Sequence, residues 1–173
     1  VLSNAMLELE PGDRIGLKKK ANGVFTLAEV PDSRDLWLFG TGTGIAPFFS
    51  ILKTEEPWRR FEKVILVHGV RTAADLRYHE LIDEIQQYRG DKFQFKAFVT
   101  RESIPGTYHG RIPAAIADGN LENACSTKLS IEDSQIMLCG NPDMVKDAVE
   151  VLKERGFKKN RRRTPGQITV ENY

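Results

Sequence analysis

The chain has 173 residues, of which 40% are hydrophobic and 28% are charged, as is typical of a globular protein with one main core. The formal net charge is only +1, so no overall field attracts the molecule to nucleic acid or to an anionic membrane surface. Two cysteines are too few for a disulfide framework, and no apolar stretch approaches the roughly 20 residues of a transmembrane helix. We therefore expect a cytoplasmic protein with no nucleic-acid or membrane partner.

The sequence before residue 30 predicts a small antiparallel pair of strands. Pro11-Gly12-Asp13 is a turn signal, and short strands are expected over residues 14–17 and 23–27. Two such strands are too few to bury a core of their own.

From residue 35 onward the pattern changes to strands that alternate with helices. Short apolar runs predict strands over residues 36–39, 64–67, 93–99, 135–138 and 168–170. The spacing of apolar residues predicts helices over 45–53, 78–88 and 113–117, and a fourth helix that Asn141 caps, Pro142 opens and Gly156 ends. Because this alternation is typical of parallel sheets, we expect a doubly wound α/β domain with a five-stranded parallel sheet.

A glycine-rich segment connects the first of these strands to the first helix. It reads Gly40-Thr41-Gly42-Thr43-Gly44 and continues as Ile45-Ala46-Pro47. In this context the loop amides and the positive end of a helix can receive phosphate oxygens. The alternative is a tight structural turn, which can use glycine equally well.

Three arginines follow predicted strands. Arg71, Arg101 and Arg111 are therefore expected near the carboxyl edge of the sheet, where ligands bind in such folds. A guanidinium fork there suits a phosphate monoester. For any single arginine, a solvated surface position is the alternative.

Several blocks resemble one known family. The glycine-rich segment through Pro47 resembles the pyrophosphate loop of ferredoxin-NADP+ reductases. The other matching blocks, in the order of that family, are Val67-His68-Gly69-Val70-Arg71, Val99-Thr100-Arg101-Glu102, Gly110-Arg111-Ile112 and Cys139-Gly140-Asn141-Pro142. The opening Val1-Leu2-Ser3-Asn4 resembles the end of a Gly-x-x-Ser segment that holds the FAD pyrophosphate. The chain thus resembles the bacterial ferredoxin/flavodoxin-NADP+ reductase family over its C-terminal, NADP-binding portion.

The resemblance implies a division of the chain. Residues 1–32 would be the remnant of an antiparallel FAD-binding β-barrel, residues 33–160 the NADP(H)-binding domain, and residues 161–173 a tail that returns toward the flavin. Most of the barrel is expected to be missing, so this chain alone is expected to be inactive.

The resemblance also implies roles for individual residues. Residues 40–44 would bind the pyrophosphate. Arg101 and Arg111 would bind the adenosine 2'-phosphate, with Arg71 a neighbour on the same side, and the three together would favour NADP(H) over NAD(H). Residues proposed at the nicotinamide and flavin are Cys139, Gly140, Asn141, Ser3, Tyr173 and, as a proton-handling group, Glu171. Cys125 is expected to be structural, and three scattered histidines predict no metal site.

The implied activity is hydride transfer between NADPH and FAD, with single-electron exchange to ferredoxin or flavodoxin. The basic run Lys158-Lys159-Asn160-Arg161-Arg162-Arg163 is either a solvated face or a surface that steers an acidic carrier toward a monomeric enzyme. Two alternatives remain open. One is an NADH-linked reductase component of an oxygenase system, and the other is a nucleotide-binding module without activity of its own.

Overall fold

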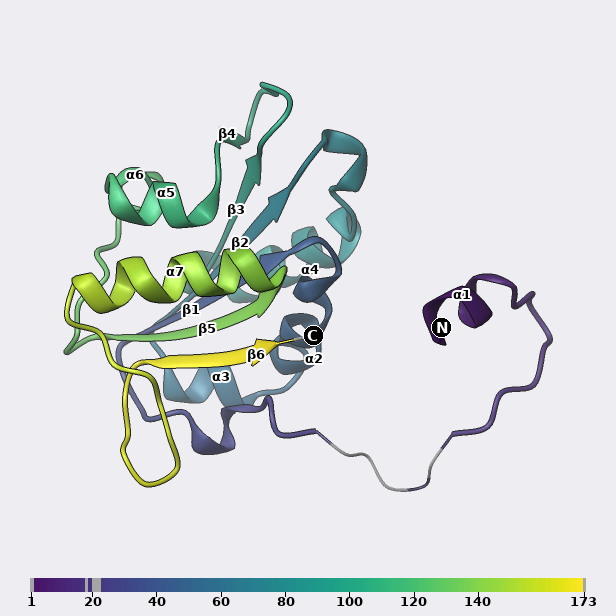
Figure 1. Ribbon diagram of the computed structural model, residues 1–173, viewed down its shortest axis with the longest axis horizontal. Helices are drawn as coiled ribbons and strands as arrows, with labels where there is room; N and C mark the ends of the chain where they lie inside the picture. Colours follow the sequence, from purple (N-terminus) through teal and green to yellow (C-terminus); the bar gives the residue numbers. More distant parts are fainter. Residues whose placement is uncertain (1, 18, 20–22, 173) are drawn as a thin grey trace.

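A twisted parallel sheet lies at the centre of the computed structural model, which describes residues 2–17, 19 and 23–172 (Figure 1). The strand order is β4-β3-β2-β1-β5-β6, and every pair of neighbouring strands is parallel. The strands are β1 (Asp35–Thr41), β2 (Lys63–Val70), β3 (Phe93–Val99), β4 (Tyr108–His109), β5 (Ser134–Gly140) and β6 (Ile168–Asn172).

The sheet confirms the predicted fold and adds one strand to it. All five predicted strands are present, but two-residue β4 makes the sheet six-stranded. β4 lies between two glycines with positive φ, Gly106 and Gly110, and pairs with Phe98 and Val99 at the end of β3. Two residues are too short for a hydrophobic pattern, so β4 depends on the pairing edge that β3 offers.

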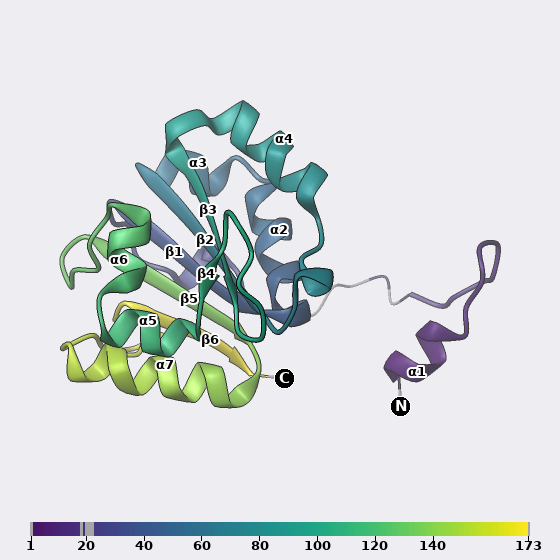
Figure 2. The ribbon, with the colours of Figure 1, turned by 90° about the horizontal axis from the view of Figure 1, so that it is seen from above.

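Helices cover both faces of the sheet, as Figure 2 shows. One face packs against α2 (Ala46–Leu52), α3 (Glu56–Arg60) and α4 (His79–Arg89). The other packs against α5 (Ile112–Ala117), α6 (Asn120–Cys125) and α7 (Pro142–Glu154). Alternate residues of β1 serve the two cores, since Leu36 and Leu38 point to the first and Trp37 and Phe39 to the second. This two-sided burial explains why the strands read as continuous apolar runs.

The helices differ from the prediction mainly in length. The region predicted as one helix over residues 45–53 begins instead with a 3-10 turn, η2 (Gly42–Ile45), before α2. Neither α3 (five residues) nor α6 (six residues) was predicted from the sequence. Further 3-10 turns are η1 (Leu27–Glu29), η3 (Ala73–Asp75) and η4 (Gly90–Lys92). No helix in the described part of the chain is long and apolar enough to cross a membrane.

The N-terminal segment differs most from the prediction. Residues 2–7 form helix α1 (Leu2–Leu7), and residues 4–17 are exposed throughout (Figure 1). The strands expected over 14–17 and 23–27 do not form. A lone pair of strands is at best marginally stable in water, and no strand of the described sheet pairs with residues 14–17 or 23–27. The assignment of residues 1–32 to a flavin-binding barrel therefore stays a prediction.

Arg60 fastens the segment that leads into β1. Its guanidinium donates to the carbonyl oxygen of Leu27 at 2.8 Å, to the carboxylate of Asp32 at 2.6 Å and to the carbonyl oxygen of Val30. The side chains of Leu27 and Val30 are buried in the core beneath it. The described chain from residue 27 onward is thus part of the sheet domain.

We expect Arg60→Lys to lower the free energy of unfolding by about 1–3 kcal/mol, because an ammonium group cannot reproduce the bonds that the planar guanidinium makes to Leu27, Val30, Asp32 and Glu56 together. Arg59→Lys is the matched control: Arg59 is exposed, and its change should stay within about 0.5 kcal/mol. Urea unfolding of both variants measures the difference. Equal losses of unfolding free energy in the two variants would show that the hydrogen bonds of Arg60 do not contribute to stability.

Candidate functional site

The glycine-rich loop lies at the carboxyl edge of the sheet, where the chain passes from β1 through η2 into α2. β1 has β2 on one side and β5 on the other, and the helices that follow β1 and β5 cover opposite faces. The ends of β1 and β5 therefore form the switch point at which open α/β sheets bind ligands. Gly42 and Thr43 are exposed there, whereas Gly44 and Ile45 are buried.

Two glycines allow the loop to pack against the end of β5. A Cβ on Gly44 would lie 2.5 Å from the Cα of Gly140, and a Cβ on Gly140 would overlap the hydroxyl of Thr41. Gly140 also has φ +131°, which other residues rarely adopt. These glycines are thus needed for contact between the two loops, whether or not a phosphate approaches them.

The two loops are also joined by hydrogen bonds. The backbone N–H of Asn141 donates to Thr41 Oγ1 at 2.9 Å. The side-chain oxygen of Asn141 caps α7 by accepting from the amides of Asp143 (2.9 Å) and Met144 (3.2 Å), as predicted. Thr41 and Asn141 therefore have structural roles, and their contacts to a nucleotide stay predictions.

His68 lies beneath the loop, on β2. Its ring is 1% exposed, and Nε2 lies 3.0 Å from the carbonyl oxygen of Gly42. Burial lowers the pKa of the imidazole, so the ring is neutral at physiological pH. His68 belongs to one of the sequence blocks that resemble the reductases, but only the structure shows its bond to the loop.

Cys139 and Glu171 come together at the same edge. They are directly paired between β5 and β6, and the Cys139 thiol donates to Glu171 Oε2 at 3.9 Å. Cys139 is fully buried and Glu171 half-buried. Tyr173 and the side chain of Ser3 lie outside the described residues, so their predicted roles are not addressed by the structure.

The three arginines occupy neighbouring loops. Arg71 follows β2 and Arg101 follows β3, and the amide of Arg101 donates to the carbonyl oxygen of Arg71 at 2.9 Å. Glu102 ties the same two loops by accepting from the amide of Ala73 at 2.8 Å. Arg111 stands at the start of α5, just after edge strand β4. All three arginines are exposed, and within the described chain none forms an ion pair with a carboxylate.

Arg111 also lines a cavity of about 450 Å³ between β4 and helices α5 and α6. Tyr108 forms part of its wall, with its ring stacked on Phe98 at a centroid distance of 5.3 Å. Asn120 and Asn123 add amide groups to the lining. Tyr108 was not predicted as a site residue, although an aromatic residue in a short loop between two glycines is a recognisable sequence signal.

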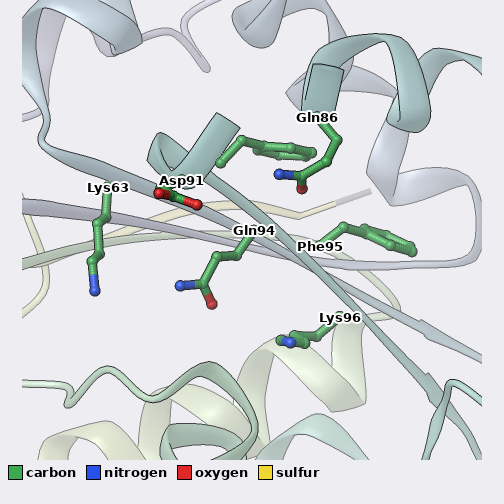
Figure 3. Close-up of a pocket in the computed structure, with 7 residues that line it drawn as sticks. Lys63, Gln86, Asp91, Gln94, Phe95 and Lys96 are labelled. Atoms are coloured by element: carbon green, nitrogen blue, oxygen red, sulfur yellow. The ribbon is translucent and has the colours of Figure 1, made fainter. Parts of the chain in front are cut away.

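A second cavity lies at the opposite edge of the sheet. Its volume is about 390 Å³, and its lining includes Lys63 and Phe93, the first residues of β2 and β3 (Figure 3). Gln94 and Lys96 project on one side of β3 there, and Gln86 and Phe95 on the other. Because this cavity is at the amino ends of the strands, it does not belong to the site.

Comparisons with known proteins agree with this geometry. The model of the oxidoreductase NAD-binding domain family matches residues 38–150. Flavodoxin/ferredoxin-NADP reductases from Buchnera aphidicola and Escherichia coli are each 42% identical over 99% of this chain, which spans 67% and 70% of their lengths. A ferredoxin NADP+ reductase from Neisseria gonorrhoeae, solved with FAD and NADP bound, superposes with a TM-score of 0.91 and is 37% identical, covering 99% of this chain and 69% of its own.

This chain belongs to the ferredoxin/flavodoxin-NADP reductase family. It corresponds to the C-terminal, NADP-binding portion of that family, as the sequence blocks predicted. The parallel six-stranded sheet is the reductase-type nucleotide-binding fold.

Substitution of Gly140 tests how tightly the two loops of this reductase domain pack. We expect Gly140→Ala to lower the free energy of unfolding by about 3 kcal/mol or more, because it combines an unfavourable φ with a clash against Thr41. Gly106→Ala is the control, since Gly106 has φ +82° but open space around it; about 1 kcal/mol is expected there. Chemical unfolding of the two variants gives the comparison. Similar losses at both positions would contradict close packing of the loops.

Proposed function

We propose that the chain binds NADP(H) and acts in hydride transfer between NADPH and FAD, with single-electron exchange to ferredoxin or flavodoxin. The observation that carries the proposal is a set of three exposed arginines on loops beside the glycine-rich turn, none of which forms an ion pair with a carboxylate of the described residues. Their positive charge is not balanced by an ion pair with a carboxylate of the described residues, and a bound phosphate monoester would balance it. The names of the relatives support the same activity.

The glycine-rich loop fits a pyrophosphate. We assign Gly40, Thr41, Gly42, Thr43 and Gly44 to it. The exposed backbone of Gly42 and Thr43 lets anionic oxygens approach closely, and the first amides of a helical turn have no intrahelical acceptor. We assign the adenosine 2'-phosphate to Arg101 and Arg111, with Arg71 beside them on the cofactor side.

The nicotinamide is assigned to the end of β5. Cys139, Gly140 and Asn141 would hold the ring in place, because hydride transfer depends mainly on the distance and angle between donor and acceptor. Glu171, in contact with the Cys139 thiol, would handle a proton. When bound, FAD supplies the conversion between hydride and single-electron chemistry. Ser3 is assigned to its pyrophosphate and Tyr173 to its ring.

The proposal also includes the division of the chain, its electron-carrying partner and its compartment. Residues 1–32 are assigned to the flavin-binding half, 33–160 to the NADP(H)-binding domain and 161–173 to the returning tail. Residues 158–159 and 161–163 of the basic run are exposed, and this supports attraction of an acidic electron carrier. We propose a monomer that works in the cytoplasm without a membrane partner.

The arginine assignment predicts a change in cofactor preference. Replacing both Arg101 and Arg111 with Ala should weaken NADP+ binding on the order of a hundredfold, because each charged hydrogen bond contributes about 1.5–3 kcal/mol. NAD+ has no 2'-phosphate, so its affinity should stay nearly constant. Calorimetric titration of the purified chain with both nucleotides measures this, with Arg162→Ala as a control from the basic run. Equal losses for the two nucleotides would make the arginines structural and remove the main support for NADP(H).

The Cys139 assignment separates chemistry from binding. Cys139→Ser should slow reduction of bound FAD by NADPH about tenfold or more while leaving NADP+ affinity within about threefold, since the residue is assigned to the nicotinamide and not to the phosphates. Stopped-flow absorbance on the same variant in a reductase that has a complete flavin-binding half gives the rate, and titration gives the affinity. A collapse of affinity with an unchanged rate would give Cys139 a different role.

A further inference from the structure

His68 contacts the glycine-rich loop from inside the protein. His68 is paired with Gly40 of β1 and Ala97 of β3, so its position is held on both sides by the sheet. The ring is almost fully buried, and Nε2 reaches the carbonyl oxygen of Gly42 at 3.0 Å. The loop is therefore anchored from below by one side chain.

The chemistry of this contact defines the protonation of the ring. A carbonyl oxygen can only accept a hydrogen bond, so Nε2 of His68 carries the hydrogen and donates it. Nδ1 is buried and has no hydrogen-bond partner among the described residues. Burial also lowers the pKa of the ring, which favours this neutral form. His68 thus acts as a fixed donor.

The bond to Gly42 also determines where the next amide points. The carbonyl of Gly42 and the N–H of Thr43 belong to one trans peptide unit, in which they point in opposite directions. Because the carbonyl is directed to the buried ring, the N–H of Thr43 is directed away from the interior, where Gly42 and Thr43 are exposed. Gly42 has φ +52°, and glycine by itself restrains this peptide unit little.

We propose that His68 is a positioning residue that holds the Gly42–Thr43 peptide with the Thr43 amide facing the pyrophosphate of NADP(H). The inference rests on the proposed function, because it takes the glycine-rich loop as the pyrophosphate site. His68 acts through the backbone of the loop and makes no contact with the nucleotide.

Three variants separate this role from simple core packing. In His68→Gln the side-chain nitrogen is the same number of bonds from Cα as Nε2 of histidine, so it can still donate to Gly42. In His68→Asn the amide is one bond shorter and falls short of the carbonyl. His68→Leu removes the donor while keeping an apolar side chain in the core.

The ligands are NADP+ and 2'-AMP, which has the 2'-phosphate but no pyrophosphate. We expect Asn and Leu to weaken NADP+ binding about tenfold, Gln to stay within about threefold of wild type, and 2'-AMP affinity to be unchanged in all three. Calorimetric titration measures both affinities. Unchanged 2'-AMP binding also shows that each variant is folded at the arginine loops.

The outcomes distinguish this inference from the function on which it rests. If wild type binds both ligands but the variants lose both equally, or if Gln is as weak as Asn for NADP+, His68 has only a packing role and the inference is overturned. Wild-type NADP+ binding that no variant changes would overturn it as well. A wild-type chain that binds neither ligand would overturn the proposed function, and the role of His68 with it.

Discussion

Backbone contact between the loops that follow β1 and β5 is the constraint on which the carboxyl edge depends. Gly44 and Gly140 approach so closely that a Cβ on either would displace the other loop. The amide of Asn141 completes the contact through the hydroxyl of Thr41. The strands at a switch point send their helices to opposite faces. This contact, added to the pairing of Gly40 with Cys139 between β1 and β5, keeps the glycine-rich turn and the start of α7 side by side.

Short backbone contacts also organise the positive charge. The whole chain carries a formal net charge of +1, so the proposed binding of an anion at this edge depends on the local placement of charge and not on an overall field. The bonds from Arg101 to Arg71 and from Ala73 to Glu102 join the loops after β2 and β3. With the backbone held in this way, the guanidinium groups remain exposed and available.

The segment before residue 18 contrasts with the rest of the described chain. From Leu27 onward the chain is fastened by Arg60, and the side-chain amide of Asn160 donates to the carbonyl oxygen of Glu29 at 2.6 Å. By contrast, Met6, Leu7, Leu9, Ile15 and Leu17 are 41–84% exposed. The sheet domain therefore buries its own apolar surface, whereas this segment gains no burial from it.

The sequence by itself determined the elements that carry a complete local signal. β1, β2 and β5 were readable because both of their faces are covered, and the start of α7 was readable because Asn141 and Pro142 are strong capping residues. Matching sequence blocks identified the family and the candidate residues of the glycine-rich loop.

Only the tertiary structure decided the features that need a distant partner. β4 forms on the free edge of β3, and residues 14–17 remain without a strand because no neighbour pairs with them. Gly44 meets Gly140, and His68 meets Gly42, across strands that are far apart in the chain but adjacent in the sheet. A hydrophobic pattern records which side of an element is buried, but the identity of the contacting partner is set by how the elements pack.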